Sequence, residues 1–188
     1  MSASTHNEKI EAIFAVAFRL FGTRGFSETK MSDIAEEAGI AKGTIYLYFS
    51  SKEELFTAMT KREFTRFVEQ LIDMLMNTTG FQERLEIVAR HHLSYYFKLK
   101  QYTRTFFHAQ DNDRFLMEAL RTFMFNYTRE VAMMLEQCGV EHAELHAKSF
   151  IGILDVFKMD ILFDNSFSIE DLEQRIAFAV KLFRFGCQ

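Results

Sequence analysis

The chain has 188 residues, no proline and a formal net charge of -4. Hydrophobic residues make up 48% of it, which is enough for a globular core. No uninterrupted apolar run approaches the roughly 20 residues of a membrane-spanning helix. The N-terminus lacks the basic and apolar regions of a secretory signal. Two cysteines are too few for a disulfide framework and suit a reducing compartment. We therefore expect a soluble, cytoplasmic protein with no membrane partner.

The hydrophobic pattern predicts helices along the whole chain. Apolar residues between Ile10 and Phe21 recur at spacings of three and four, and Gly22 and Gly25 follow them. This pattern predicts a first helix at about 7–23. Further helices are expected at about 32–38, from 41 or 42 through 49, from about 50 to 75, and at about 81–100, 102–110, 112–137, 141–163 and 168–185. The absence of proline agrees with such a succession of helices. The predicted class is all-α, with about nine helices.

Residues 26–52 have the pattern of a helix-turn-helix. The first short helix is followed by Gly39, where the turn needs a left-handed residue, and then by the apolar Ile40. The second short helix begins near Lys42 and is rich in aromatic residues. In a DNA-binding motif of this kind the second helix lies in the major groove. Residues 1–66 carry nine basic and nine acidic side chains, so the excess acidity lies outside the motif and does not exclude DNA as a partner.

The same segment resembles the N-terminal domain of the TetR family of bacterial transcription repressors. The match extends from about Ile10 to Phe56 and is most specific in the run Lys42-Gly43-Thr44-Ile45-Tyr46 with Tyr48, Phe49 and Lys52. The resemblance implies a three-helix DNA-binding domain, here residues 1–50, joined by a long helix to a helical ligand-binding and dimerisation domain, here residues 51–188. It also implies a homodimeric repressor that a small molecule releases from a palindromic operator. Activation of transcription by the same fold is the alternative.

Ten residues are expected to contact DNA. Lys42 would bind a phosphate, and Gly43 would allow a close approach of the backbone. Leu47 suits contact with a thymine methyl group. Lys52 resembles the family's lysine that clamps the DNA backbone. For the hydroxyl residues near the first motif helix, capping of that helix is the alternative. The set is Thr29, Lys30, Ser32, Lys42, Gly43, Thr44, Tyr46, Leu47, Tyr48 and Lys52.

Three residues depart from the usual pattern of the family. Ala41 stands where a serine or threonine often caps the recognition helix, and Lys30 stands where a small hydroxyl residue is frequent. Leu47 replaces a residue that is often histidine or tyrosine. The operator sequence therefore cannot be taken over from relatives.

The rest of the chain is rich in phenylalanine, with 22 such residues and no tryptophan. A helical core explains most of them, and a pocket for a small apolar or aromatic effector is the second interpretation. The residues expected to line that pocket are Phe64, Phe67, Leu71, His92, Tyr95, Tyr96, Phe107, Phe123, Tyr127 and Phe157.

Residues 150–162 are apolar on nearly all sides, so the helix that carries them must be covered on more than one side. The next helix has an apolar stripe from Ile169 to Phe183. We expect a homodimer formed through the helices at about 141–163 and 168–185. A three-layer core within one subunit is the alternative.

Other chemistry has weaker support in the sequence. Cys138, His142 and His146 are spaced four apart, which would suit a metal-responsive sensor. Gly139 interrupts the chain between the first two, and solvated histidines explain the pair as well. Neither a glycine-rich phosphate loop nor a nucleophile elbow is present. We expect no enzymatic activity, no cofactor and no bound metal.

Overall fold

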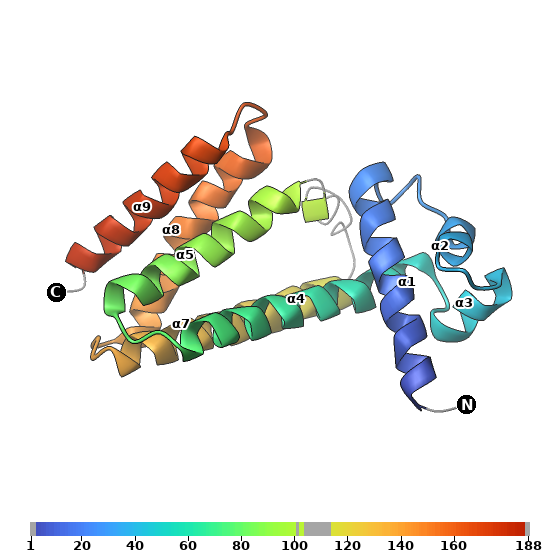
Figure 1. The fold of residues 1–188 in the computed structure, drawn as a ribbon, viewed down its shortest axis with the longest axis horizontal. Helices are drawn as coiled ribbons and strands as arrows, with labels where there is room; N and C mark the ends of the chain where they lie inside the picture. The colour runs from blue at the N-terminus through green and yellow to red at the C-terminus, as the bar shows by residue number, and fades with distance from the viewer. Residues whose placement is uncertain (1–2, 101, 104–113, 187–188) are drawn as a thin grey trace. The chain divides into compact units, whose positions relative to one another are not determined.

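The computed structural model describes residues 3–100, 102–103 and 114–186. Within these ranges the chain is helical and contains no strand (Figure 1). The described helices are α1 (Ala3–Arg24), α2 (Met31–Glu37), α3 (Lys42–Tyr48), α4 (Lys52–Met76), α5 (Phe81–Lys98), α7 (Arg114–Gln137), α8 (Ala143–Phe163) and α9 (Ile169–Gly186). The predicted all-α class is confirmed. Most of the helix predicted at 102–110 lies outside the described residues.

The chain divides into two compact units. The first contains Met1–Glu63 and Gln101–Leu120, and the second contains Phe64–Lys100 and Arg121–Gln188. Helices α4 and α7 each contribute residues to both units. The first half of α4 thus belongs with α1, α2 and α3, beyond the boundary expected after residue 50.

The core of the first unit comes from the apolar faces of its helices. Fully buried side chains include Ile13, Ala17, Leu20 and Phe21 of α1, Ile34 of α2, Ile45 of α3 and Leu55 of α4. The Phe21 ring meets the Phe56 ring edge-on at 5.2 Å between centroids. Gly39 has a φ of +68° in the turn between α2 and α3, and the Ile40 N–H donates to the Ala35 carbonyl at 3.0 Å. This left-handed turn sets the angle between the two helices of the motif.

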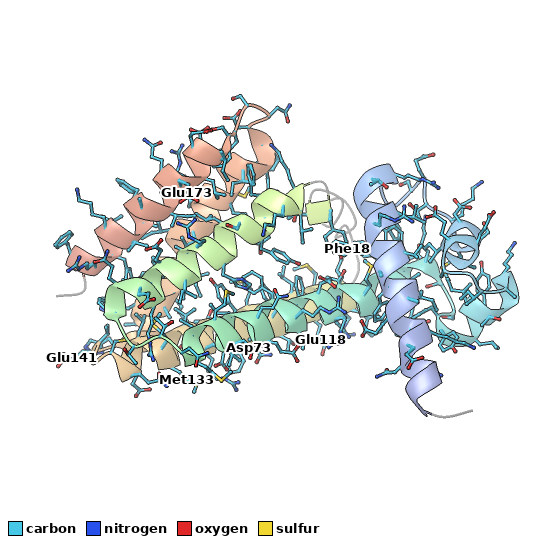
Figure 2. All side chains as sticks on the ribbon, viewed as in Figure 1. Phe18, Asp73, Glu118, Met133, Glu141 and Glu173 are labelled. Atoms are coloured by element: carbon cyan, nitrogen blue, oxygen red, sulfur yellow. The ribbon has the colours of Figure 1, made fainter. Side chains whose placement is uncertain are left out.

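Tyr102 also belongs to the first unit. Its ring stacks on that of Phe18 at 4.2 Å between centroids, and Phe18 is labelled on α1 in Figure 2. Its hydroxyl shares a buried hydrogen bond of 2.9 Å with the Thr60 hydroxyl. Tyr102 therefore packs against α1 and the first half of α4 within this unit.

In the second unit, aromatic rings of α4, α5 and α7 pack together. The Phe67 ring lies 5.0 Å from Tyr95, 5.4 Å from Phe123 and 5.2 Å from Tyr127, in each case edge-on. Figure 2 shows side chains filling the space among these helices. Helices α5 and α9 are joined at the surface by Arg90, which donates to Glu173 at 2.8 Å. No helix among the described residues has the length and apolar character needed to cross a bilayer.

Candidate nucleic-acid interface and effector site

Helix α3 buries one side and exposes the other. The Ile45 side chain is buried, whereas Tyr46 is 47% exposed and Leu47 is 84% exposed. Lys42 and Gly43 are also exposed, and the space beside Gly43 is open. The exposed side chains come from positions that the sequence assigned to DNA contact. A leucine exposed to this degree gains nothing from the core, so its apolar surface is free to meet a partner.

Thr44 and Tyr48 are half-buried at the edges of the same helix. The Tyr48 ring lies 5.0 Å from the His6 ring. The α3 N-cap, Ala41, has an extended backbone (φ -63°, ψ 144°) and provides no side-chain hydrogen bond. The recognition helix therefore starts without the hydroxyl cap that a serine or threonine would supply.

The residues before and within α2 have different environments. Lys30 is exposed and is the N-cap of α2, without a side-chain capping bond. The half-buried Ser32 donates its hydroxyl to Asp33 Oδ1 at 3.1 Å. Thr29 is 0% exposed, and its hydroxyl donates to the Gly25 carbonyl at 2.8 Å. Contrary to expectation, the Thr29 side chain is thus unavailable to DNA in this structure and instead holds the turn after α1.

Lys52, in the first turn of α4, is bound to the loop before α2. Its ammonium donates to the carbonyl oxygens of Phe26 at 2.7 Å and Ser27 at 3.4 Å. The same nitrogen lies 4.4 Å from the centroid of the Phe26 ring. We therefore expect Lys52 to act on DNA binding through the position of this loop.

Seven of the residues predicted to line the effector pocket form one connected group of rings in the second unit, which we call the aromatic cluster. Its members are Phe64, Phe67, His92, Tyr95, Tyr96, Phe123 and Tyr127. Leu71 is fully buried. Phe157 packs on α9, with its ring 6.1 Å from Phe178 and 5.7 Å from the Arg175 guanidinium. Phe107 lies outside the described residues.

Polar groups meet at the edge of the aromatic cluster. His92 Nδ1 is 3.1 Å from the Tyr127 hydroxyl, and His92 Nε2 is 3.5 Å from Asp155 Oδ1. Asp155 forms an ion pair with Lys158 one turn further along α8, and the Lys158 ammonium lies 4.9 Å from the centre of the Tyr96 ring. We call His92, Tyr127, Asp155 and Lys158 the polar cluster. It combines a buried imidazole and a buried phenol with a partly exposed carboxylate and ammonium.

Burial governs the ionisation of the polar cluster. It lowers the pKa of His92 below the ordinary value of 6.5 and raises the pKa of Tyr127. Burial would also raise the pKa of Asp155, but the nearby His92 and the charge of Lys158 outweigh it and lower the pKa of this carboxyl. The site therefore holds a neutral imidazole beside a carboxylate–ammonium pair.

Asp155 and Lys158 were not among the predicted pocket residues. A signal for them exists in the sequence, because they are two of the three charged residues in the largely apolar run 150–162. Charged groups on such a helix are rarely buried unless they are paired. Their partner on α5, His92, is more than 60 residues away in the chain, and no periodicity links the two.

The three residues considered for a metal site have separate environments. Cys138 Sγ lies 3.9 Å from Arg84 Nη1. His142 is the exposed N-cap of α8, with a φ of +52°. The His146 ring packs edge-on against Phe183. In the part of the chain that the structure describes, no three suitable side chains are grouped to hold a metal ion.

Comparison with known proteins identifies the N-terminal part of the chain. Residues 13–59 match the model of the family of bacterial regulatory proteins, tetR family. The fatty acid metabolism regulator protein of Bacillus subtilis (strain 168) is 31% identical over 86 residues. That alignment covers 46% of this chain and 44% of the relative, so the chain spans less than half the length of this curated protein.

Two crystal structures share the fold over nearly the whole chain. A putative TetR-family transcriptional regulator from Mesorhizobium loti has a TM-score of 0.83 at 22% identity, covering 97% of both chains. The regulator FadR from Bacillus subtilis, solved in complex with stearoyl-CoA, has a TM-score of 0.74 at 21% identity, covering 92% of this chain and 96% of its own. These relatives are transcription regulators and not enzymes. Residues 13–59 thus match the DNA-binding domain of the tetR family, and over nearly its whole length the chain has the fold of TetR-family transcription regulators.

Proposed function

We propose that the chain is a ligand-responsive transcription regulator, acting as a repressor, that binds a palindromic operator as a homodimer. The observation that carries this proposal is helix α3, which follows a glycine turn and exposes Tyr46 and Leu47 beside an open backbone at Gly43. A helix presented in this way fits the major groove of DNA.

The exposed and half-buried residues of the motif divide by chemistry. The ammonium groups of Lys30 and Lys42 would contact phosphates, as would the hydroxyl groups of Ser32, Tyr46 and Tyr48. The remaining contacts would come from Thr44 and Leu47, whose methyl groups suit the methyl group of thymine in the major groove. Phosphate contacts fix the position of α3, whereas the base contacts select the operator sequence.

The exposed apolar side chains of α8 and α9 support a dimer. Six of them recur at spacings of three and four, namely Val156, Met159 and Phe163 of α8 with Phe178, Leu182 and Phe185 of α9. Exposed apolar side chains that gather on one face of a helix are typical of an interaction site. A second copy packed on it would give a four-helix interface, and two-fold symmetry would then supply two α3 helices for a palindromic operator.

The aromatic cluster supports an apolar or aromatic effector. Its rings come from α4, α5 and α7, so a molecule bound among them would alter how these helices pack. A relative that regulates fatty acid metabolism and a structural neighbour holding stearoyl-CoA both favour an apolar ligand. Release from DNA requires the effector to bind the non-DNA-binding conformation more tightly than the DNA-binding one.

Two measurements test the proposal. Native mass spectrometry of the freshly purified chain should show a dimer, and a strictly monomeric species would contradict the dimeric repressor. Fluorescence anisotropy with a selected operator should show weaker binding by Tyr46→Ala at unchanged thermal stability. Met74→Ala is the control, because Met74 is a similarly exposed side chain on α4 outside the motif. Equal operator affinity of wild type and Tyr46→Ala would remove Tyr46 from the interface.

A further inference from the structure

The polar cluster contains one buried donor that the protein leaves unpaired. His92 is 2% exposed. Among the buried side-chain nitrogen and oxygen atoms of the described residues, only its Nε2 lacks a hydrogen-bond partner. Its nearest acceptor, Asp155 Oδ1, is 3.5 Å away, which is longer than an N–H···O hydrogen bond. Leaving such a group unpaired is costly, and each case in a folded protein calls for an explanation such as a ligand.

We propose that the polar cluster binds the hydroxyl group of an otherwise apolar or aromatic effector. The ligand hydroxyl accepts a hydrogen bond from His92 Nε2–H and donates its own hydrogen to the Asp155 carboxylate. This inference rests on the proposed ligand-responsive function, and it specifies the polar group that the effector carries.

The neighbours of His92 determine which ring nitrogen carries the hydrogen. An ionised carboxylate only accepts hydrogen bonds, and Asp155 faces Nε2. Nε2 therefore carries the hydrogen, and Nδ1 accepts from the Tyr127 hydroxyl at 3.1 Å. The result is an N–H donor and a carboxylate acceptor that face each other without a proper hydrogen bond. A hydroxyl oxygen is the small neutral group that serves both, because it accepts and donates at one atom.

The charges in the cluster disfavour other polar groups. Lys158 already pairs with Asp155, so these two side chains together are neutral. A ligand carboxylate would place a second negative charge beside Asp155, and a ligand ammonium would place a second positive charge beside Lys158. Buried like charges are strongly unfavourable. A carbonyl oxygen could accept from His92 but has no hydrogen to donate to Asp155.

The rest of the ligand must match apolar surroundings. The Tyr96 ring lies 5.0 Å from the His92 ring, and the Tyr127 ring lies 5.7 Å from it. Phe67 and Tyr127 are both 1% exposed. Aromatic rings favour offset or edge-on contact with another ring. A phenol with an apolar substituent therefore supplies both the hydroxyl group for His92 and Asp155 and an aromatic ring for the surrounding side chains. We therefore use para-butylphenol as the probe.

The test compares three ligands that differ only in the polar group. Isothermal calorimetry is performed on the purified full chain with para-butylphenol, with its methyl ether and with butylbenzene. The ether keeps the acceptor oxygen but loses the hydrogen for Asp155, so it should bind about 10- to 100-fold more weakly than the phenol. Equal affinity of phenol and ether, or no binding of the phenol, would overturn the proposal without recourse to any variant.

Two further readouts locate the site. In nitrogen-15 spectra of labelled histidines the phenol should shift the His92 Nε2 resonance, whereas His91, whose Nε2 is engaged with the Phe67 carbonyl at 2.8 Å, is the internal control. The variant His92→Phe should bind phenol and ether alike, and the matched variant His146→Phe on α8 should keep the wild-type preference for the phenol. Preserved discrimination in His92→Phe would place the hydroxyl elsewhere and contradict the proposal.

Failure of this inference and failure of the proposed function give different results. Tight, hydroxyl-dependent binding that leaves the affinity for operator DNA unchanged would contradict ligand-responsive regulation and retain the hydroxyl site. Release of DNA by butylbenzene as readily as by the phenol would retain the regulation and overturn the hydroxyl site.

Discussion

Lys52 Nζ, at the start of α4, donates a 2.7 Å hydrogen bond to the Phe26 carbonyl and lies 4.4 Å from the centre of the Phe26 ring. This contact joins the loop before α2 to the helix that follows α3, so it encloses the whole helix-turn-helix. The arrangement combines a hydrogen bond from a charged donor with a cation–π contact, both stronger than neutral surface contacts.

Replacement of Lys52 by methionine should therefore destabilise the first unit. We expect the free energy of unfolding to fall by about 1–3 kcal/mol, because the Phe26 carbonyl loses its charged donor. Urea denaturation followed by circular dichroism measures the change, with Lys61→Met on the same helix as the control for an exposed lysine. Lys52 could act on DNA binding by positioning the loop or by contacting a phosphate, and the salt dependence of operator binding separates these roles. The slope of log affinity against log salt concentration should be unchanged in Lys52→Met if Lys52 positions the loop. A slope smaller by about one would show a direct phosphate contact.

Ala41→Ser should stabilise the recognition helix. Ala41 already has the extended backbone of an N-cap and lacks only a side-chain acceptor. The Thr44 N–H already donates to the Ala41 carbonyl at 2.8 Å, so a serine hydroxyl would accept from the Gly43 N–H. The free energy of unfolding should rise by about 0.5–1 kcal/mol. Thermal unfolding measures this gain, and Ala41→Gly is the control because it lacks the hydroxyl. A lower melting temperature for the serine variant would show that the start of α3 does not accept this cap.

Leu47→Ala should change sequence preference without changing stability. Leu47 is 84% exposed, so its truncation leaves the core intact. We expect the preference for thymine at one operator position to fall by about 1 kcal/mol, while the salt dependence of binding stays the same. Lys42→Met should do the opposite, with a salt slope lower by about one and little change in sequence preference. Both are measured by binding to operator variants, and an unchanged preference in Leu47→Ala would exclude base contact by this residue.

The stability of the protein should depend on pH through His92. Burial lowers its pKa in the folded state below 6.5, so below pH 6.5 the unfolded chain binds a proton that the folded chain does not. The free energy of unfolding should therefore decrease as the pH falls from 6.5 toward the lower folded-state pKa. His92→Phe should reduce this slope by up to about 1.4 kcal/mol per pH unit. Burial also lowers the pKa of His91, so part of the pH dependence of stability should remain in His92→Phe. The same pH dependence in variant and wild type would contradict a neutral buried His92.

Local patterns predicted the helix-turn-helix well because its determinants lie close together in the chain. Gly39 was expected to be left-handed and has a φ of +68°. Ile45 and Phe49 are apolar residues four positions apart, and both are buried. Helix α2 begins and ends within one residue of the predicted bounds. Periodicity and turn chemistry act over a few residues, so the sequence alone determines these features.

Features that depend on packing between distant segments were not predicted. Thr29 was expected to contact DNA or to cap α2, but its side chain is buried in the turn after α1, where its hydroxyl donates to the Gly25 carbonyl. The contact between His92 and Asp155 joins α5 to α8, and its unpaired nitrogen follows from a distance that no sequence pattern encodes. Composition correctly indicated an aromatic interior, but which rings meet there depends on the helix packing.

The most direct test of the central claim is selection of bound sequences from a random double-stranded DNA library by the purified full chain. A dimeric regulator should enrich one palindromic sequence, with its two halves centred about 34–36 Å apart or at a related helical spacing, as two α3 helices of a dimer require. Enrichment of no sequence, or of a single unsymmetrical half-site, would contradict this expectation.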